Sequence, residues 1–394
     1  MMAMEKLDAD ISDFIAAGAN SRDDMFSRLL LRSFADQYAS SAPYRDYCRK
    51  IGTAPETLTS WDEIPAVASF RHWDRLEQFY PRQQAEKLSL ESRTVDLSHT
   101  RGPFFPAKRL VELMRLVQLK TARRYLFPDV SWMKMLFFVP QPRMAPGMVM
   151  ASGLERIREA FGEAGSRFLI SFTGLDLKGF VKELRTAELD GQPLAILGAT
   201  HGLDYFMAAC LKAGVGFRLP AGSRIMDSGG FMGRYGATPP EQFFRNCETV
   251  FGISRNYCVN ALWICESSTV YLDTVLADVV AGSPGERRKI PPPWTRIQIV
   301  DPLTFRRVEP GKPGLIRLFD LSNRGMAPVV QTDKMGYETG DGFEIIGKLD
   351  RNDPQGGMDL KPSHPGGKLV SRLMESAMRR KMAGVGNFAG ISNQ

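Results

Sequence analysis

The sequence has few cysteines and none of the spacings that cysteine chemistry requires. Its 394 residues include five cysteines, with no CxxC pair and no zinc-binding spacing: Cys48, Cys210, Cys247, Cys258 and Cys265. A disulfide framework and a structural zinc site are therefore not predicted. Reduced thiols of this kind are typical of a cytosolic protein.

Long apolar runs and a basic leader are also lacking. The first residues, MMAMEKLDADISDF, are acidic and contain no basic segment followed by an apolar run, so no signal peptide is predicted. The longest apolar stretches, such as MKMLFFV, are far shorter than a membrane span of about 20 residues. We therefore expect a soluble, cytoplasmic protein with no membrane span.

No large block of one charge is present. The net charge is +7, but 51 basic residues are scattered among 44 acidic ones, and only short basic runs occur at residues 287–289 and 379–381. Such runs are typical of solvated faces, so nucleic-acid binding is not predicted.

The apolar pattern that is present predicts an α/β fold. The chain is long enough for one large core or two ordinary ones. Phe26, Leu30, Phe34 and Tyr38 follow helical spacing and predict that the fold starts with a helix over residues 23–38. Between about residues 95 and 270 the strand candidates MKMLFFVP, SRFLISF and PLAILGAT alternate with the helix candidates LKGFVKELRTAELDG and GLDYFMAACLKAG. That alternation favours helices layered on a largely parallel sheet.

The predicted secondary structure changes after GSPGERRKIPPP, residues 282–293. Short strands with close turns follow, namely WTRIQIVD, GLIRLFD, MAPVVQT and FEIIGKL, and they favour a small antiparallel barrel or meander. Four parts are predicted: an N-terminal helical region at 1–90, an α/β core at 91–282, a small β-barrel subdomain at 283–348 and a reduced tail at 349–394. The tail is Gly- and Pro-rich and leads into a last predicted helix, residues 368–382.

One stretch carries a family resemblance. Residues 219–273, LPAGSRIMDSGGFMGRYGATPPEQFFRNCETVFGISRNYCVNALWICESSTVYLD, resemble the acyl-protein synthetases of bacterial bioluminescence, the LuxE-like branch of the adenylate-forming superfamily that includes acyl-CoA synthetases. The resemblance extends over about residues 20–350. It implies a large adenylate-forming domain of layered sheets flanked by helices plus a small barrel, with 91–282 binding nucleotide and acyl group, and a short C-terminal stub.

The implied reaction joins a carboxylic acid, fatty or aromatic, to AMP from ATP. It needs magnesium, phosphate-binding donors and a carboxylate for the ribose. In the superfamily the ribose-binding Asp lies well over ten residues before a hinge Gly-Lys or Gly-Arg, here Gly347-Lys348. Asp333 lies 14 residues before Gly347 (347 − 333), and Asp341 only 6 (347 − 341). Asp333 is therefore the predicted ribose ligand, and YETGD is a turn; turn capping is the alternative use of either Asp.

The resemblance places magnesium on Glu266, since carboxylates are the usual ligands of this hard cation. Its surroundings depart from the family, because Leu262 replaces an aromatic residue, Trp263 a glycine and Cys265 a hydroxyl residue. A surface or helix-capping glutamate is the alternative interpretation.

Two glycine-containing loops complete the nucleotide site that the resemblance implies. Gly229 and Gly230 form a tight turn under the adenine, and Met232 replaces a basic residue there. The phosphate loop is LSHTRGPFF, with Ser98, Thr100, Arg101 and Gly102 as candidate phosphate ligands. His99 and Arg101 occupy family Gly and Thr positions. Arg101 binds phosphate in one interpretation; in the other, both are exposed residues of a decayed site.

The C-terminal part departs most from the family. No cysteine follows Cys265, so a covalent acyl-enzyme of the family type is not expected. Only 46 residues (394 − 348) follow Lys348, too few for the full C-terminal domain of about one hundred residues. PSHPGGKLVSRL resembles the segment of the catalytic lysine and makes Lys368 its candidate beside the hinge Lys348, although the tail also has the pattern of a basic amphipathic helix.

His201 follows a predicted strand at the edge where α/β sheets bind ligands. It lines the carboxylate pocket in one interpretation and is a structural histidine in the other.

Two functions from different classes follow. The first is an adenylate-forming ligase that hands its acyl group to a partner such as a reductase, a carrier protein or an acyltransferase. The second is a catalytically degraded nucleotide- or acyl-binding subunit that acts as an assembly partner. Glu266, Asp333 and Lys348 favour the first, whereas the phosphate loop and the run from Leu262 to Cys265 favour the second.

Overall fold

The computed structural model describes residues 2–18, 23–68, 107–144, 149–171, 174–228, 238–264, 267–324, 327–348 and 380–388. The chain divides into two compact units, each assembled from three segments. Unit 1 comprises Met1–Thr121, Trp263–Tyr271 and Arg288–Asp359, and unit 2 comprises Ala122–Leu262, Leu272–Arg287 and Leu360–Gln394. Each unit has its own hydrophobic core.

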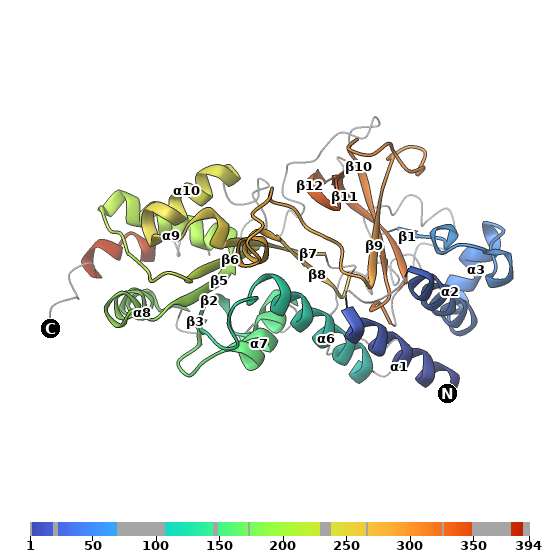
Figure 1. The fold of residues 1–394 in the computed structure, drawn as a ribbon, viewed down its shortest axis with the longest axis horizontal. Coiled ribbons are helices and arrows are strands. Elements are labelled where there is room, and N and C mark those ends of the chain that lie inside the picture. The colour runs from blue at the N-terminus through green and yellow to red at the C-terminus, as the bar shows by residue number, and fades with distance from the viewer. Residues whose placement is uncertain are drawn as a thin grey trace. The chain divides into compact units, whose positions relative to one another are not determined.

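A mostly parallel sheet of seven strands forms the framework of unit 2 (Figure 1). Its strands are β2 (Lys134–Pro140), β3 (Arg167–Ser171), β4 (Gly174–Leu175), β5 (Leu194–Ala199), β6 (Arg224–Ser228), β7 (Cys258–Trp263) and β8 (Val270–Leu272). The order is β4-β3-β2-β5-β6-β7-β8, with parallel pairing from β3 through β2, β5 and β6 to β7, and antiparallel pairing of β4 with β3. The predicted parallel sheet and its three strand candidates are confirmed.

Four helices occupy connections of this sheet: α7 (Val149–Phe161), α8 (Leu177–Asp190), α9 (Thr200–Ala213) and α10 (Pro240–Phe251). A fifth, α11 (Val275–Val280), follows β8. The helix α8 starts where the carboxylate of Asp176 accepts a 2.9 Å hydrogen bond from the backbone N–H of Gly179, and it ends at Gly191 in left-handed backbone, φ 66°. Central strand β5 is buried along almost its whole length, as expected for a strand covered on both faces. A side chain at Gly198 would come within 2.7 Å of Cβ of Phe138 on β2, so glycine permits this close pairing.

The core of unit 2 includes residues from the end of the described chain. Phe206 of α9 stacks on Phe251 with ring centroids 5.7 Å apart, and Met382 and Val385 are buried in the same cluster. Val385 belongs to the short 3-10 helix η7 (Val385–Phe388). The described C-terminal segment thus packs into unit 2; residues 380–382 are helical, and the remainder of the predicted last helix, including Lys368, lies outside the described residues.

Unit 1 combines helices with a second sheet. Its helices are α1 (Met2–Ala17), α2 (Asp23–Ser40), α3 (Ala42–Lys50) and most of α6 (Ala107–Tyr125). Its strands are β1 (Val67–Ala68), β9 (Thr295–Val300), β10 (Gly314–Asp320), β11 (Val329–Thr339) and β12 (Gly342–Lys348). Strands β9 to β12 form an antiparallel meander, as predicted for this part of the chain, and β1 joins β11 in parallel.

The prediction that the fold starts at residue 23 is wrong, because α1 precedes that helix. Leu7, Ile11, Phe14 and Ile15 of α1 are buried with residues of α2 and the second sheet. Buried Arg324 also reaches both helices, and donates hydrogen bonds to Asp8 at 2.6 Å and Asp36 at 2.9 Å. These contacts explain why the acidic first segment is ordered as a helix. Within the described ranges, every helix is too short or too polar to cross a bilayer.

Candidate functional site

The carboxyl ends of five parallel strands share one edge of the sheet in unit 2. The chain passes from β2 outward to β3 and then returns to the other side of β2 to form β5, β6 and β7. Strand order therefore reverses between β2 and β5. In open α/β sheets, ligands bind outside the carboxyl ends at such a reversal. The residues that follow β5, β6 and β7 are therefore the first place to look for a site.

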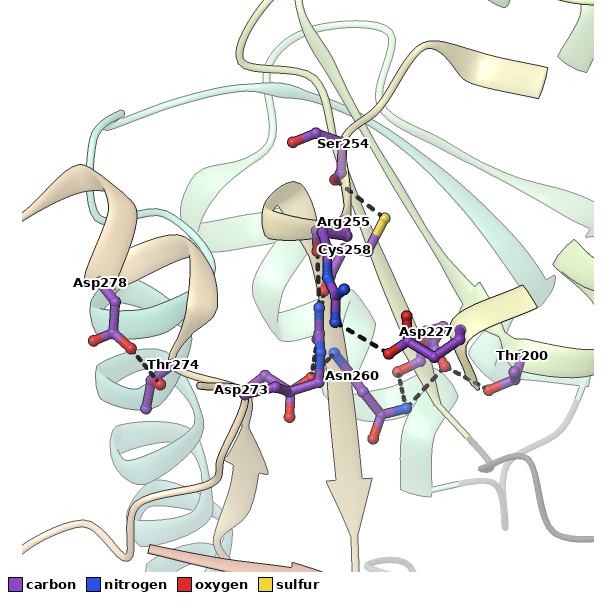
Figure 2. Close-up of polar contacts among 11 residues, drawn as sticks. Thr200, Asp227, Ser254, Arg255, Cys258, Asn260, Asp273, Thr274 and Asp278 are labelled. Carbon is purple, nitrogen blue, oxygen red and sulfur yellow. Dashed lines mark hydrogen bonds and ion pairs between the residues drawn. The ribbon is translucent and has the colours of Figure 1, made fainter. Parts of the chain in front are cut away.

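Asp227 is the most unusual side chain at this edge. It is the penultimate residue of β6 and has no solvent exposure. Its Oδ2 accepts hydrogen bonds from Oγ1 of Thr200 at 2.7 Å and from Nδ2 of Asn260 at 2.8 Å, and the two donors approach from the start of α9 and from β7 (Figure 2). Its Oδ1 is buried and has no hydrogen-bond partner in the part of the chain that the structure describes.

Burial dominates the titration of this carboxyl. Loss of hydration raises the pKa of Asp227 to about 6, and the nearby negative charge of Asp273 adds to the rise. The hydrogen bonds from Thr200 and Asn260 and the positive charge of Arg287 oppose it. Above about pH 6, Asp227 is therefore a buried carboxylate with one oxygen that lacks a donor.

A second set of contacts fixes the strand that carries Asn260. The backbone N–H of Asn260 donates to Oδ2 of Asp273 at 3.0 Å, and the backbone N–H of Asp273 donates to the carbonyl of Asn260 at 3.1 Å. Arg287 forms an ion pair with Asp273 and donates to the carbonyl of Cys258 at 2.8 Å. Figure 2 shows Asn260 between Asp273 and Asp227. Asn260 is thereby held in one position relative to β6.

His201 lies at the same edge, directly after Thr200 in α9. Its ring meets that of Tyr205 edge-on, with centroids 6.3 Å apart and planes at 75°, and the side chain is half-buried. The predicted location at a strand end is confirmed. Its role in a carboxylate pocket stays a prediction.

The two aspartates considered for the ribose lie at opposite ends of one hairpin in unit 1. In the β11–β12 ladder, Lys334 pairs with Lys348 and Met335 with Gly347, so the backbone of Asp333 lies beside the predicted hinge. Gly340 and Asp341 form the turn at the far end. The hairpin that the spacing argument required between Asp333 and Gly347 is present. The side chains of Asp333 and Lys348 lie outside the described structure.

Asp341 has a local partner in this turn. Nε of Arg288 donates to its Oδ1 at 2.7 Å, and the side chain remains 60% exposed. The hydrogen bond from Arg288 lowers the pKa of Asp341. The prediction that YETGD contains a turn is confirmed for Gly340 and Asp341, while Tyr337 to Thr339 belong to β11.

The residues that follow Glu266 are anchored in unit 1. Asp320 at the end of β10 is fully buried, and its Oδ2 accepts a hydrogen bond from Oγ of Ser267 at 2.6 Å. The backbone N–H of Ser268 donates to Oδ1 of Asn323 at 2.9 Å. Oγ1 of Thr269 accepts from the indole of Trp294 at 2.9 Å. The chain is thus fixed from the residue next to Glu266 onward.

The remaining predicted site residues are not described by the structure. They are Ser98, Thr100, Arg101, Gly102, Gly229, Gly230, Glu266 and Lys368. Strand β6 ends one residue before Gly229. Among the described residues, no group of three or more His, Cys, Asp and Glu side chains is arranged to hold a metal ion. The magnesium ligand therefore stays a prediction.

Sequence reasoning missed Asp227, Asn260 and Asp320. The segment RIMDS is buried throughout although it contains Asp227, and CVNALW places Asn260 among mostly apolar residues. A buried polar residue of this kind needs a partner, and that is a detectable signal. The partners, however, lie 27 to 53 residues away in the chain.

Comparison with known proteins identifies the fold. No protein-family model matches the chain, and no curated protein matches its sequence. The open conformation of 2-hydroxyisobutyryl-CoA ligase in complex with 2-HIB-AMP and CoA matches with a TM-score of 0.58 at 12% identity, over 93% of this chain and 91% of that chain. The same ligase in its thioesterification state gives a TM-score of 0.53 at 14% identity, over 84% and 69%. The chain has the α/β fold of an adenylate-forming domain.

Proposed function

We propose that this protein activates a carboxylic acid with ATP as an acyl adenylate. A carboxylate oxygen attacks the α-phosphorus of ATP, the bond to the β-phosphate breaks, and pyrophosphate leaves. The observation that carries the proposal is the fold, which is shared with a ligase whose solved structure holds an acyl adenylate, 2-HIB-AMP. The β11–β12 hairpin supports it, because Lys334 pairs with Lys348, so the backbone of Asp333 lies one residue beyond the pair that includes the hinge lysine.

In this proposal Asp333 binds the ribose hydroxyls, because a carboxylate accepts two hydrogen bonds from a pair of hydroxyls. Lys348, which pairs with Lys334, is proposed to bring a positive charge to the nucleotide. Gly229 and Gly230 follow β6 and allow the backbone to approach the base. Ser98, Thr100, Arg101 and Gly102 bind the phosphates, and Lys368 is the candidate lysine of the tail.

Glu266 is proposed to hold the magnesium ion, which when bound neutralises charge on the phosphates. The buried contacts of Ser267, Ser268 and Thr269 support this assignment, because they fix the chain on the C-terminal side of Glu266. A metal ligand on an anchored segment keeps its position when substrate enters. Asp320 is the centre of that anchor.

The acid is proposed to be fatty or aromatic, with His201 lining its pocket. The acyl group is proposed to pass from the adenylate to a partner protein. A reductase or a carrier protein fits the LuxE-like resemblance.

A second function is supported by one specific feature. Trp263 stands where the family has glycine, and its indole Nε1 is buried without a hydrogen-bond partner in the described part of the chain. A bulky side chain there removes the close backbone approach that glycine allows. This feature favours a nucleotide- or acyl-binding subunit that has lost catalysis and acts as an assembly partner.

ATP–pyrophosphate exchange with a panel of fatty and aromatic acids separates the two functions. The ligase predicts exchange with at least one acid, and a loss of about ten- to hundredfold in Asp333→Ala and in Glu266→Ala, because each removes a charged hydrogen-bonding group. Asp341→Ala is the matched control and should retain exchange. Loss with Asp341→Ala instead would mean that the hinge assignment is wrong. No exchange with any acid would favour the degraded subunit.

A further inference from the structure

One oxygen of the buried Asp227 carboxylate accepts no hydrogen bond from the residues that the structure describes. The side chain has no solvent exposure, and Oδ1 has no partner among the described residues, although Oδ2 has two. Buried polar atoms in folded proteins nearly always have a partner, so each exception requires an explanation. An unpaired carboxylate oxygen is among the most costly exceptions because it carries charge.

The orientation of Oδ1 is preset by the contacts of Oδ2. Thr200 donates from the start of α9 and Asn260 from β7, so the carboxylate is held by donors on both neighbouring elements. Asn260 is fixed in turn by Asp273 (Figure 2), which forms an ion pair with Arg287. A group that only filled space would not need two hydrogen-bond donors, one of them on a strand that is itself held by further contacts. This arrangement resembles a binding group whose geometry is fixed before its ligand arrives.

The location of Asp227 matches that function. It is one residue from the carboxyl end of β6, at the edge where α/β sheets bind ligands, and Thr200 begins the helix that follows β5. The neighbouring residues Ser228 and Ala261 bond to each other, because Oγ of Ser228 donates to the carbonyl of Ala261 at 2.8 Å. Of these three residues, Asp227 has an acceptor atom, Oδ1, that is left for a ligand.

We propose that Asp227 is a ligand-recognition residue whose Oδ1 accepts a hydrogen bond from an N–H or O–H donor of the ligand held at this edge. The inference deepens the proposed function and rests on it for the identity of the ligands. Two sources can supply such a donor. One is the 6-amino group of ATP, and the other is a hydroxyl or amino group on the carboxylic acid.

Asparagine at position 227 should reverse the preference for a ligand donor over a ligand acceptor. Thr200 and Asn260 both donate, so the carbonyl oxygen of an asparagine would take the place of Oδ2. Its NH₂ group would then occupy the position of Oδ1 and donate where the wild type accepts. Asp227→Asn should therefore favour a 6-oxo purine over a 6-amino purine, or a ligand acceptor over a ligand donor.

Calorimetric titration tests the nucleotide source. The probes are ATP, inosine triphosphate with a 6-oxo group, and purine riboside triphosphate with hydrogen at C6. Wild type should bind ATP about ten- to hundredfold more tightly than either analogue, because an unpaired buried acceptor is costly. Asp227→Asn should bind inosine triphosphate more tightly than ATP. Asp278→Asn is the control and should keep the wild-type order of affinities, because it replaces a carboxylate on α11 that accepts a hydrogen bond from Thr274 and not from the Asp227 group.

The acid source is tested with matched pairs. Wild type is titrated with an acid that bears a hydroxyl or amino group and with the same acid lacking that group. If the acid supplies the donor, wild type should bind the substituted acid about ten- to hundredfold more tightly, and Asp227→Asn should lose this difference. Thr200→Val is a second variant that removes one donor to Oδ2 and keeps the shape of the side chain. It should reduce the preference several-fold.

The two wild-type titrations do not depend on any variant folding. Tighter binding of ATP than of its analogues, or of the substituted acid than of the unsubstituted one, supports the inference. The titration that shows the difference identifies which ligand supplies the donor. Equal affinity within both pairs, or no binding of any probe, overturns it. Preference without pyrophosphate exchange would retain the recognition site and reject the ligase, so the two proposals fail separately.

Discussion

Two fully buried aspartates near strand ends, one in each unit, have opposite hydrogen-bond status. Asp320 of β10 is saturated: Oδ2 accepts from Ser267, and Oδ1 accepts from both the backbone N–H and the hydroxyl of Ser322. Asp227 of β6 accepts two hydrogen bonds on one oxygen and none on the other within the described residues. Burial raises the pKa of both carboxyls.

The number of hydrogen bonds that each carboxylate accepts distinguishes a buried aspartate that holds the fold together from one that is available to a ligand. A saturated carboxylate organises the chain around it, and its loss leaves several donors unpaired. An open carboxylate stabilises little in the free protein, but it has a vacant acceptor for a ligand. Asp320 thus accounts for the ordered chain beside Glu266, and Asp227 accounts for selectivity at the sheet edge.

The largest expected effect is on stability at Asp320. Asp320→Ala should lower the free energy of unfolding by about 3–5 kcal/mol, because the hydroxyls of Ser267 and Ser322 and a backbone N–H lose their acceptor in a buried site. Urea unfolding followed by circular dichroism measures it. A loss below about 1 kcal/mol would break the comparison, since the saturated aspartate would then contribute no more than an ordinary surface residue.

The pH dependence of stability should distinguish Asp227. Its pKa is about 6 in the folded protein and about 3.9 when unfolded, so the folded state binds the proton more tightly. The stabilising contribution is complete below about pH 3.9 and is lost as pH rises through about 6, a change of about 3 kcal/mol. The charges of Asp273 and Arg287 act on the same group and are unchanged in Asp227→Asn.

Relative to wild type, Asp227→Asn should therefore gain stability as pH rises from 4 to 7. Urea unfolding of both proteins at each pH gives the difference, in which the other carboxyls cancel. Parallel curves for the two proteins would show that Asp227 titrates normally and is not the open carboxylate described.

A smaller effect is expected at Ser267. Ser267→Ala removes the donor to Asp320 and the acceptor of the Thr269 N–H, and should cost about 1–3 kcal/mol. Ser268→Ala is a matched control, because Oγ of Ser268 is buried without a partner in the described chain. It should be neutral or slightly stabilising. Equal losses in the two variants, measured by urea unfolding, would contradict the anchoring role of Asp320.

The smallest effect is expected at Asp341. Its ion pair with Arg288 is largely exposed, so Asp341→Ala should change stability by less than about 1 kcal/mol and leave any exchange activity within about twofold. Thermal unfolding and the exchange assay measure the two quantities. A tenfold loss of exchange would move the ribose site to the turn of the hairpin.

Local pattern was sufficient to predict the layers of the fold. The apolar runs at Met135–Phe138 and Leu194–Leu197 are buried strands, and helical spacing located α8 and α9. The helix α1 was predictable in the same way, because Leu7, Ile11, Phe14 and Ile15 follow one helix face. The spacing of Asp333 from Gly347 correctly required a hairpin between them.

The polar groups at the sheet edge were not predictable by such patterns. Asp227 and its donors Thr200 and Asn260 are far apart in sequence and meet only through the order of β5, β6 and β7. The segmentation of both units was hidden for the same reason, since each is assembled from three separate parts of the chain. Long-range pairing is set by tertiary packing, which local propensity does not encode.

The most direct test is a crystal structure of the protein with a non-hydrolysable ATP analogue and an acid that supports exchange. We predict a ligand N–H or O–H within about 2.7–3.2 Å of Oδ1 of Asp227, with Thr200 and Asn260 still on Oδ2 and the contacts of Asp320 unchanged. Oδ1 bonded to a protein group or to water, with the ligand donors elsewhere, would contradict the account.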